Sequence, residues 1–171
     1  MLLLSPLFVA VCIAVKLSSP GPVIFKQRRY GLDGKEIQVY KFRTMTVTED
    51  GPTIRQASRD DSRVTPVGRV LRRYSIDELP QLVNVLKGEM SLVGPRPLPL
   101  RDYQLLEDWH RRRYAVLPGM TGLWQISGRS GLSFDDLVRL DFTYLENWSI
   151  WLDISIIVKT IPAVITRRGA Y

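Results

Sequence analysis

Residues 1–15 (MLLLSPLFVAVCIAV) contain no charged side chain, and a basic segment that begins at Lys16 follows them directly. The apolar run is shorter than the roughly 20 residues that a helix needs to cross a bilayer. Pro6 lies inside the run, where a proline interrupts helical hydrogen bonding. We therefore expect residues 1–18 to form a membrane-associated helix, re-entrant or interfacial, and not a simple span. A buried core helix or a truncated span would share this composition, and both stay open.

The segment from Lys16 to Arg43 predicts a short β-hairpin. Residues 23–30 and 37–40 have the composition of two strands, and the sequence GLDG at residues 31–34 is typical of a turn. The segment holds seven basic and two acidic residues, so it carries five of the chain's seven net positive charges. Beside a membrane helix, each Lys or Arg would add about 1 kcal/mol of attraction to anionic lipid. The alternative is a solvated edge hairpin whose charges only discourage aggregation.

The rest of the sequence predicts mainly helices, so the expected fold is α+β, mainly helical with one small hairpin. Helices are expected at residues 66–74, 77–87, 100–116, 133–147 and 149–168. Ser133 and Asp136 have the spacing of a capping box at the start of the fourth of these helices. Loops are expected at residues 46–64 and 118–131, and the arginines at residues 111–113 are expected on a solvated helix face.

Composition limits the classes of function. The length of 171 residues and the 45% hydrophobic share indicate one globular domain and exclude a disordered chain. A single cysteine, Cys12, and a single histidine, His110, argue against a disulfide framework, a cysteine zinc site and a histidine-driven triad. The net charge of +7 points to an anionic partner: nucleic acid, a phosphorylated substrate or acidic lipid. We expect no nucleic-acid partner, because the basic residues are scattered among acids and form no known motif.

Asp77 and Glu78, within residues 75–80 (SIDELP), are the first candidates for catalysis. Adjacent carboxylates can hold a hard cation together with substrate phosphates, and one carboxylate could attack phosphorus. The same stretch also matches a capping box, with Ser75 as the cap and Glu78 three residues later. Acids stabilise a helix N-terminus without any catalytic role, and the tetrapeptide alone favours this simpler explanation.

Several arginines near these acids favour a functional site. Arg72 and Arg73 precede the pair, Arg96 stands between two prolines, and Arg129 lies in a glycine-containing loop. Flanking prolines fix the backbone, which is useful where a guanidinium must meet phosphate oxygens in a set orientation. Surface salt bridges, worth about 0–1 kcal/mol, would explain any one arginine equally well. Two acids with several arginines point to a phosphate-containing substrate and a metal ion.

Seven segments, taken in order, resemble the bacterial sugar transferases, also called monotopic phosphoglycosyl transferases or polyprenyl-phosphate sugar-1-phosphate transferases. The likeness covers almost the whole chain, and the ordered set is far more specific than any single segment. The segments lie at residues 19–25, 40–45, 75–97, 118–122, 128–129, 147–149 and 152–153.

The resemblance implies transfer of a sugar 1-phosphate from a nucleotide sugar to polyprenyl (undecaprenyl) phosphate, with release of UMP. This reaction would be the first membrane step of exopolysaccharide or other glycan assembly. Residues 123–129 (LWQISGR) are similar to the corresponding segment of hexose-1-phosphate transferases, which suggests a UDP-hexose donor. The family requires Mg²⁺ as its cofactor.

By the same resemblance, Asp77 is the nucleophile that forms a covalent phosphosugar intermediate, and Glu78 assists with the metal and with proton handling. Both acids are expected to ligate Mg²⁺. The residues expected to bind substrate or its phosphates are Lys41, Arg73, Arg96, Arg129 and Asp153.

The resemblance also implies a re-entrant membrane helix (residues 1–18), broken at Ser5 and Pro6, that packs on a catalytic domain (residues 19–171). The expected location is the cytoplasmic face of the bacterial inner membrane, with interfacial helices on lipid; a homo-oligomer stays open. Only residues 1–4 precede Ser5, fewer than in the family, so we expect a shortened membrane helix. The competing hypothesis is a catalytically inactive membrane-surface module that binds anionic lipid and needs neither Asp77 nor Glu78.

Overall fold

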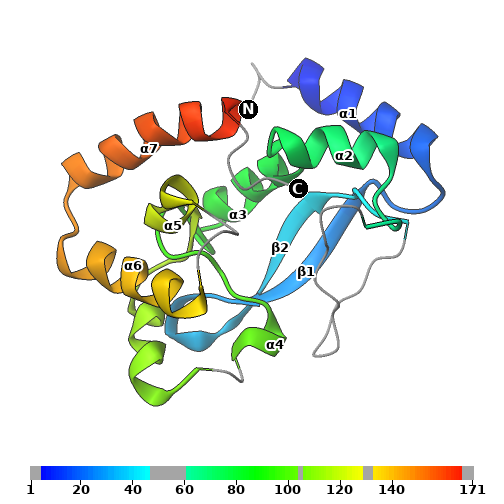
Figure 1. The fold of residues 1–171 in the computed structure, drawn as a ribbon. Coiled ribbons are helices and arrows are strands. Elements are labelled where there is room, and N and C mark those ends of the chain that lie inside the picture. Colours follow the sequence, from blue (N-terminus) through cyan, green and yellow to red (C-terminus); the bar gives the residue numbers. More distant parts are fainter. Residues whose placement is uncertain (1–4, 47–60, 104–105, 129–132, 167–171) are drawn as a thin grey trace.

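The computed structural model of the chain describes residues 5–46, 61–103, 106–128 and 133–166. These segments form the predicted α+β fold, mainly helical with one small antiparallel hairpin (Figure 1). The strands are β1 (Ile24–Tyr30), β2 (Glu36–Phe42), β3 (Ser91–Val93) and β4 (Gly119–Thr121). The α-helices are α1 (Ser5–Ser18), α2 (Pro66–Arg73), α3 (Leu82–Leu86), α4 (Leu100–Tyr103), α5 (Leu123–Ser127), α6 (Phe134–Glu146) and α7 (Ile150–Ile165). The 3-10 helices of this part are η2 (Leu32–Gly34), η3 (Ile76–Gln81) and η4 (Asp108–Ala115).

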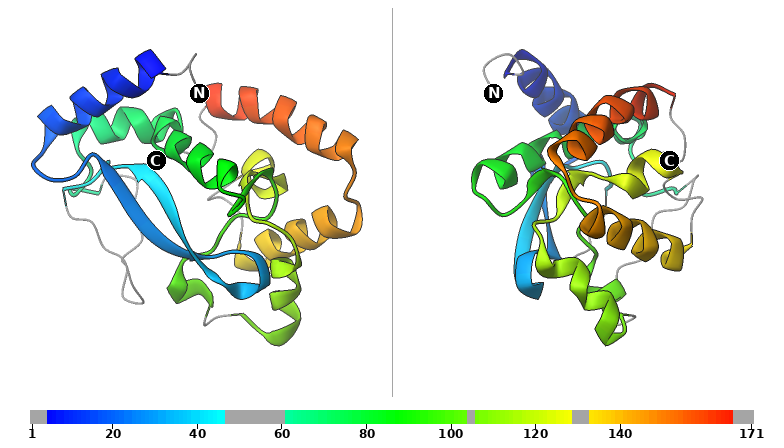
Figure 2. Two further views of the ribbon diagram at one scale, coloured as in Figure 1. Left: turned by 180° about the vertical axis from the view of Figure 1, so that it is seen from behind. Right: turned by 90° about the vertical axis from the view of Figure 1, so that its left-hand side faces the viewer.

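The predicted hairpin is confirmed. β1 and β2 pair antiparallel in a register that places Ile24 opposite Phe42, and η2 is the connecting turn. Asp33 in that turn has a φ of 55°, a left-handed conformation that a short polar side chain tolerates. Figure 2 shows the hairpin as a long twisted ribbon. Val39 and Phe42 of β2 are buried.

α1 is a continuous helix from Ser5, and Pro6 lies in its first turn, where a proline removes no helical hydrogen bond. Its inner face packs on α2 and β2. The buried residues of this cluster are Val11, Val15, Phe42 and Leu71. The expected break at Ser5 and Pro6 involves residues 1–4, which lie outside the described part. Among the helices that the structure describes, none is long and apolar enough to cross a membrane.

A buried arginine that the sequence did not single out fastens the end of α1 to β2. Arg43, only 3% exposed, donates to the main-chain oxygens of Ser19 (2.5 Å), Pro22 (2.6 Å) and Val15 (3.3 Å). Carbonyl groups at a helix C-terminus carry partial negative charge and lack partners within the helix. Arg43 therefore fixes α1 relative to the strand that carries Lys41.

α1 and α7 lie along the same side of the molecule in every view, and both leave apolar residues in solvent (Figures 1 and 2). The exposed fraction reaches 82% at Leu17, next to the end of α1, and 76% at Trp151 in α7. Other exposed apolar residues of the two helices are Leu7, Val9, Ile13, Ile150, Ile154, Ile157, Val158, Ile161 and Ile165. So much apolar surface on one side of a molecule is typical of an interaction site.

The predictions for α2, α6 and α7 are confirmed, with ends within three residues of those expected. At α6, Ser133 accepts from the Asp136 amide (3.1 Å) while Asp136 accepts from the Ser133 amide, which is the predicted capping box. At α7, Ser149 caps the first turn by accepting from the Leu152 amide (3.1 Å). These elements follow from local signals: cap residues and helical periodicity.

The single helix predicted over residues 100–116 is wrong. The structure has α4 and then η4, because Glu107 and His110 form a capping box that starts a new helix. The Glu107 amide donates to His110 Nδ1 at 3.1 Å, so the imidazole has a structural role.

The loop predicted over residues 118–131 is also wrong in part, since β4 and α5 form there. β4 pairs in parallel with β3, a partner that is distant in sequence. A Cβ atom at Gly119 would collide with the main chain of Gly94, so glycine permits this close approach of the two backbones.

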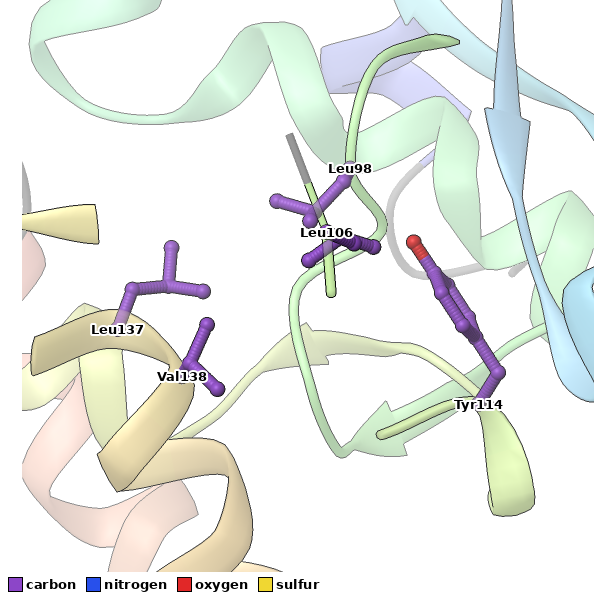
Figure 3. Close-up of a cluster of buried hydrophobic side chains, with 5 residues drawn as sticks. All are labelled: Leu98, Leu106, Tyr114, Leu137 and Val138. Atoms are coloured by element: carbon purple, nitrogen blue, oxygen red, sulfur yellow. The ribbon is translucent and has the colours of Figure 1, made fainter. Parts of the chain in front are cut away.

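The solvated helix face predicted for residues 111–113 is wrong for one of the three arginines. Arg111 and Arg112 are exposed, but Arg113 is 1% exposed and pairs with Asp141 of α6, because η4 packs against that helix. Tyr114, the residue after Arg113, belongs to the core cluster shown in Figure 3. The buried residues of this cluster are Leu98, Leu106, Tyr114, Leu137 and Val138.

Candidate active site

η3 carries both candidate carboxylates, Asp77 and Glu78, directly after α2. The helix predicted over residues 77–87 is η3 followed by α3, and the predicted capping box is absent: the Ser75 side chain makes no cap hydrogen bond. Ser75 has φ 54° and ψ 20°, a left-handed conformation imposed by the tight turn from α2 into η3. A side-chain cap needs extended backbone at that position. Helix capping therefore does not explain the two acids.

Glu78 binds two cations through one oxygen. Lys41 Nζ and Arg96 NH2 each donate to Glu78 Oε1 at 2.8 Å. Lys41 belongs to β2 and Arg96 to the segment after β3, so three separate parts of the chain meet here. Burial raises the pKa of Glu78, but the charges and hydrogen bonds of Arg96 and Lys41 lower that pKa well below its ordinary value. The Glu78 carboxylate is therefore ionised and fixed in position.

Asp77 has a different environment. It is 9% exposed, and among the described residues no hydrogen bond or ion pair holds its carboxylate. Burial, and then the charge of Glu78, raise the pKa of Asp77 to about 6, whereas the charges of Lys41 and Arg72 lower it. Neighbouring carboxylates whose pKa values are pushed apart are typical of active sites. Asp77 is the member of the pair that remains free to react.

A small cavity next to Glu78 is lined by several positively charged side chains. Its lining residues are Arg29, Val39, Lys41, Gln81, Arg96 and Pro97. Three of the six are cationic, and Arg96 also lies over Trp124, with its guanidinium carbon 5.5 Å from the ring centre. Guanidinium and ammonium groups are common partners of phosphate oxygens, so these side chains are candidates for contact with a phosphate-bearing ligand outside this water-sized cavity.

Of the predicted site residues, the structure brings Lys41, Asp77, Glu78 and Arg96 together. Within the described segments, no hydrogen bond or ion pair joins Arg73 or Asp153 to that group. Arg73 is exposed at the end of α2, and Asp153 in α7 accepts a hydrogen bond from the Tyr144 hydroxyl (2.9 Å). Arg129 lies outside the described residues.

The sequence analysis did not name Arg29 as a site residue. Arg72, which it noted beside the acids, acts on Asp77, since its charge lowers the pKa of that carboxyl group. Arg29 donates to Gln27 Oε1 and to the Pro97 carbonyl (2.9 Å), and so faces the cavity. A signal was present for Arg29, because the alternation of a hairpin places it on the same face as Lys41.

The carboxylate pair fits Mg²⁺ that is shared with a substrate. Within the described residues, no group of three or more histidine, cysteine, aspartate or glutamate side chains could hold a metal ion. Mg²⁺ commonly uses one or two carboxylates and completes its ligands with substrate phosphates and water. Asp77 and Glu78 supply that number of hard oxygen ligands.

A buried aspartate and a partly buried glutamate beside several cations define a site suited to phosphoryl chemistry, on a domain that exposes two apolar helices. The chain belongs to the bacterial sugar transferase family, whose family model matches residues 1–167.

Three relatives illustrate the similarity. The UDP-glucose:undecaprenyl-phosphate glucose-1-phosphate transferase of Caulobacter vibrioides is 47% identical over 99% of this chain and 66% of its own length. The protein of the same name from Escherichia coli K12 is 46% identical over 100% of this chain but only 39% of its own length. The exopolysaccharide production protein ExoY of Rhizobium meliloti is 42% identical over 100% of this chain and 82% of its own length. The chain therefore spans less than two thirds of the first two relatives.

Proposed function

We propose that this chain transfers a sugar 1-phosphate from a UDP-hexose to undecaprenyl phosphate and releases UMP, as an early step of exopolysaccharide or related glycan assembly. The names of the relatives support this reaction class. The observation that carries the proposal is the contrast between the two carboxylates: Glu78 is held by Lys41 and Arg96, whereas Asp77 is buried and unpaired among the described residues. A covalent intermediate on Asp77 would let one small site serve a soluble donor and a lipid acceptor in turn.

In the first half-reaction, an Asp77 carboxylate oxygen attacks the phosphorus that bears the sugar. The new O–P bond forms while the bond between that phosphorus and the oxygen shared with UMP breaks, and UMP leaves with the electron pair. Charge that develops on the transferred phosphate lies beside Lys41 and Arg96, whose positive charges stabilise it. With a pKa of about 6, Asp77 is mostly ionised at neutral pH, as a nucleophile must be.

In the second half-reaction, an oxygen of undecaprenyl phosphate attacks the same phosphorus. The bond to Asp77 breaks, the carboxylate is restored, and the product is a lipid diphosphate sugar. We assign to Glu78 the orientation of Lys41 and Arg96 and not proton transfer, because its strongly lowered pKa makes it a weak base.

We propose Mg²⁺ as the cofactor, with Asp77 and Glu78 as its protein ligands beside the donor phosphates. When bound, Mg²⁺ would neutralise charge on the diphosphate. Chelation with EDTA is expected to abolish UMP release, and added Mg²⁺ is expected to restore it.

We further propose that α1 and α7 lie in the surface of the bacterial inner membrane, on its cytoplasmic face. The exposed apolar residues of both helices support a lipid contact, and Trp148 and Trp151 are of the type favoured at the lipid–water interface. Only the end of the hairpin that follows α1 would then lie near anionic headgroups, because its turn η2 contacts η4 on the opposite side of the molecule. This placement brings the site to the acceptor's phosphate.

The test measures UMP release from UDP-glucose with undecaprenyl phosphate and Mg²⁺. With donor alone, the intact mass of the wild-type chain is expected to increase by one sugar phosphate, and Asp77→Asn is expected to lose both the adduct and the turnover. Undiminished turnover in Asp77→Asn would contradict the nucleophile assignment. A wild-type chain that binds vesicles but releases no UMP from any UDP-sugar would support the inactive lipid-binding module instead.

A further inference from the structure

The three residues at positions 95–97 are held at every main-chain oxygen. Pro95 O accepts from the Gly119 amide (2.9 Å), Arg96 O from the Arg113 guanidinium (2.8 Å), and Pro97 O from the Arg29 guanidinium (2.9 Å). The two prolines have fixed φ angles, and the three hydrogen bonds restrain the carbonyl orientations and therefore the ψ angles. The backbone that carries the Arg96 side chain is thus fixed from three different elements.

Arg113 is the buried member of this set. It is 1% exposed, and its Nε donates to Asp141 Oδ2 at 2.9 Å while its NH2 contacts both Asp141 Oδ2 and the Arg96 carbonyl. Asp141, 4% exposed, belongs to α6, so one guanidinium joins η4, α6 and the Arg96 segment. Among the described residues, no other side chain donates a hydrogen bond to the Arg96 carbonyl.

The Arg113–Asp141 pair is not explained by stability alone. Replacing a buried ion pair by apolar residues of similar volume is often neutral or stabilising. Within the described residues, NH1 of Arg113 is also buried without a hydrogen-bond partner, which adds a cost. The feature that an apolar pair could not reproduce is the third contact, the hydrogen bond to Arg96 O. Polar groups that satisfy no structural need are expected near functional sites.

We propose that Arg113, held by Asp141, is a positioning residue that fixes the Arg96 backbone and so directs the Arg96 guanidinium toward Glu78 and the substrate phosphate. The part that concerns substrate rests on the proposed function. The part that concerns Arg96 is a property of the folded chain. The Arg96 guanidinium lies 2.8 Å from Glu78 Oε1 and over the Trp124 ring, and both contacts depend on where the main chain of Arg96 is held.

The test variant combines Arg113→Met with Asp141→Leu, which removes the third contact but leaves no buried charge unpaired. We expect a folded protein whose kcat falls about 10- to 100-fold, because small misplacements of a catalytic group have effects of that size. On an Arg96→Ala background the same pair of changes is expected to cause little further loss. Relaxation of the Arg96 Nε–H measured by NMR is expected to show a rigid side chain in the wild type and a mobile one in the variant.

The matched control exchanges the exposed pair Asp108 and Arg111 of the same η4 helix for Leu and Met; it is expected to keep wild-type kcat and a rigid Arg96. If the double variant does not fold, Arg113→Lys replaces it: the lysine keeps a positive charge to pair with Asp141 but lacks the guanidinium group that also donates to the Arg96 carbonyl. A rigid Arg96 in either folded variant, or losses that add fully to those of Arg96→Ala, would overturn the proposal. If the wild type releases no UMP, the proposed function fails, and Arg96 relaxation still decides whether Arg113 positions it.

Discussion

Arg96 NH2 lies 2.8 Å from Glu78 Oε1, although the two residues are 18 positions apart in the chain. Lys41 contacts the same oxygen, so a single carboxylate orients two cations. The side chains are only 26% and 19% exposed for Arg96 and Glu78, which reduces screening by solvent compared with a surface ion pair. This arrangement leads to the first of five predictions.

Glu78→Gln keeps the shape of the side chain but removes the charge that orients Lys41 and Arg96. We expect kcat for UMP release to fall about 100-fold, since loss of one preorganised electrostatic partner typically costs roughly 10²–10³ in rate. The matched control is Glu36→Gln on the exposed end of the hairpin, which should keep wild-type kcat. Equal rates for the two variants would show that Glu78 has no role in orienting the cations.

The pH profile should report Asp77. Because burial raises its pKa to about 6, the folded protein holds a proton on Asp77 at pH values where an ordinary aspartate is ionised. The nucleophile must be deprotonated, so kcat/KM is expected to fall about tenfold per pH unit below about pH 6 and to level off above it. A profile that stays flat down to pH values near the ordinary aspartate pKa would contradict this assignment.

Arg72 and Arg73 can be separated by the same measurement. The charge of Arg72 lowers the pKa of Asp77, so Arg72→Gln should raise that pKa and move the acid limb to higher pH. Arg73→Gln and Arg69→Gln remove charge from exposed positions of α2 and should leave the limb in place. A shift caused by Arg73→Gln and not by Arg72→Gln would contradict the assignment of this charge effect to Arg72.

Arg43→Met should destabilise the fold through the end of α1. Three main-chain oxygens would lose a charged donor in a buried position, and we expect about 3 kcal/mol less free energy of unfolding in guanidinium titrations. Arg28→Met on the exposed hairpin face is the control and should change stability by less than about 0.5 kcal/mol. A small effect at Arg43 would mean that α1 is held by its apolar contacts alone.

Trp151→Ser should weaken membrane association if α7 lies in the lipid surface. Trp151 is 76% exposed, and loss of its apolar area is expected to reduce binding to phosphatidylethanolamine–phosphatidylglycerol vesicles about tenfold, measured by sedimentation. Trp109→Ser is the matched control: Trp109 is 53% exposed but lies in η4, at the bottom of Figure 1 and opposite α1 and α7. Equal effects of the two changes would argue against the membrane placement of α7.

Local signals account for the elements that were predicted correctly. The GLDG turn and strand alternation specify the hairpin, and Ser133 with Asp136 specifies the start of α6. The apolar surface of α7 follows from its composition, since so many apolar residues around one helix cannot all be buried in a chain of this size. The Asp77–Glu78 pair and Arg96 were likewise recognisable from residue type and flanking prolines.

Other features depend on which distant segments meet. Ser75 had the right residue type for a cap, but the direct turn from α2 into η3 forces it into the left-handed region, where it cannot cap. Arg113 was indistinguishable from Arg111 and Arg112 in sequence, because only the packing of η4 on α6 decides which of the three is buried. Arg29 is positioned by its hydrogen bond to the Pro97 carbonyl, a contact between two segments that are distant in the chain.

By itself, the sequence determined the chemistry available to this protein: two adjacent carboxylates, an excess of basic residues, and two terminal helices with more apolar residues than the fold can bury. Those properties are local, because they depend on residue type and on neighbours within a few positions. Only the tertiary structure decided which cations face which carboxylate. The pKa of the ion-paired Glu78 is therefore lowered, whereas the pKa of Asp77 is raised. Coulombic and desolvation effects act over a few ångströms in space, and spatial distance is set by packing and not by position in the chain.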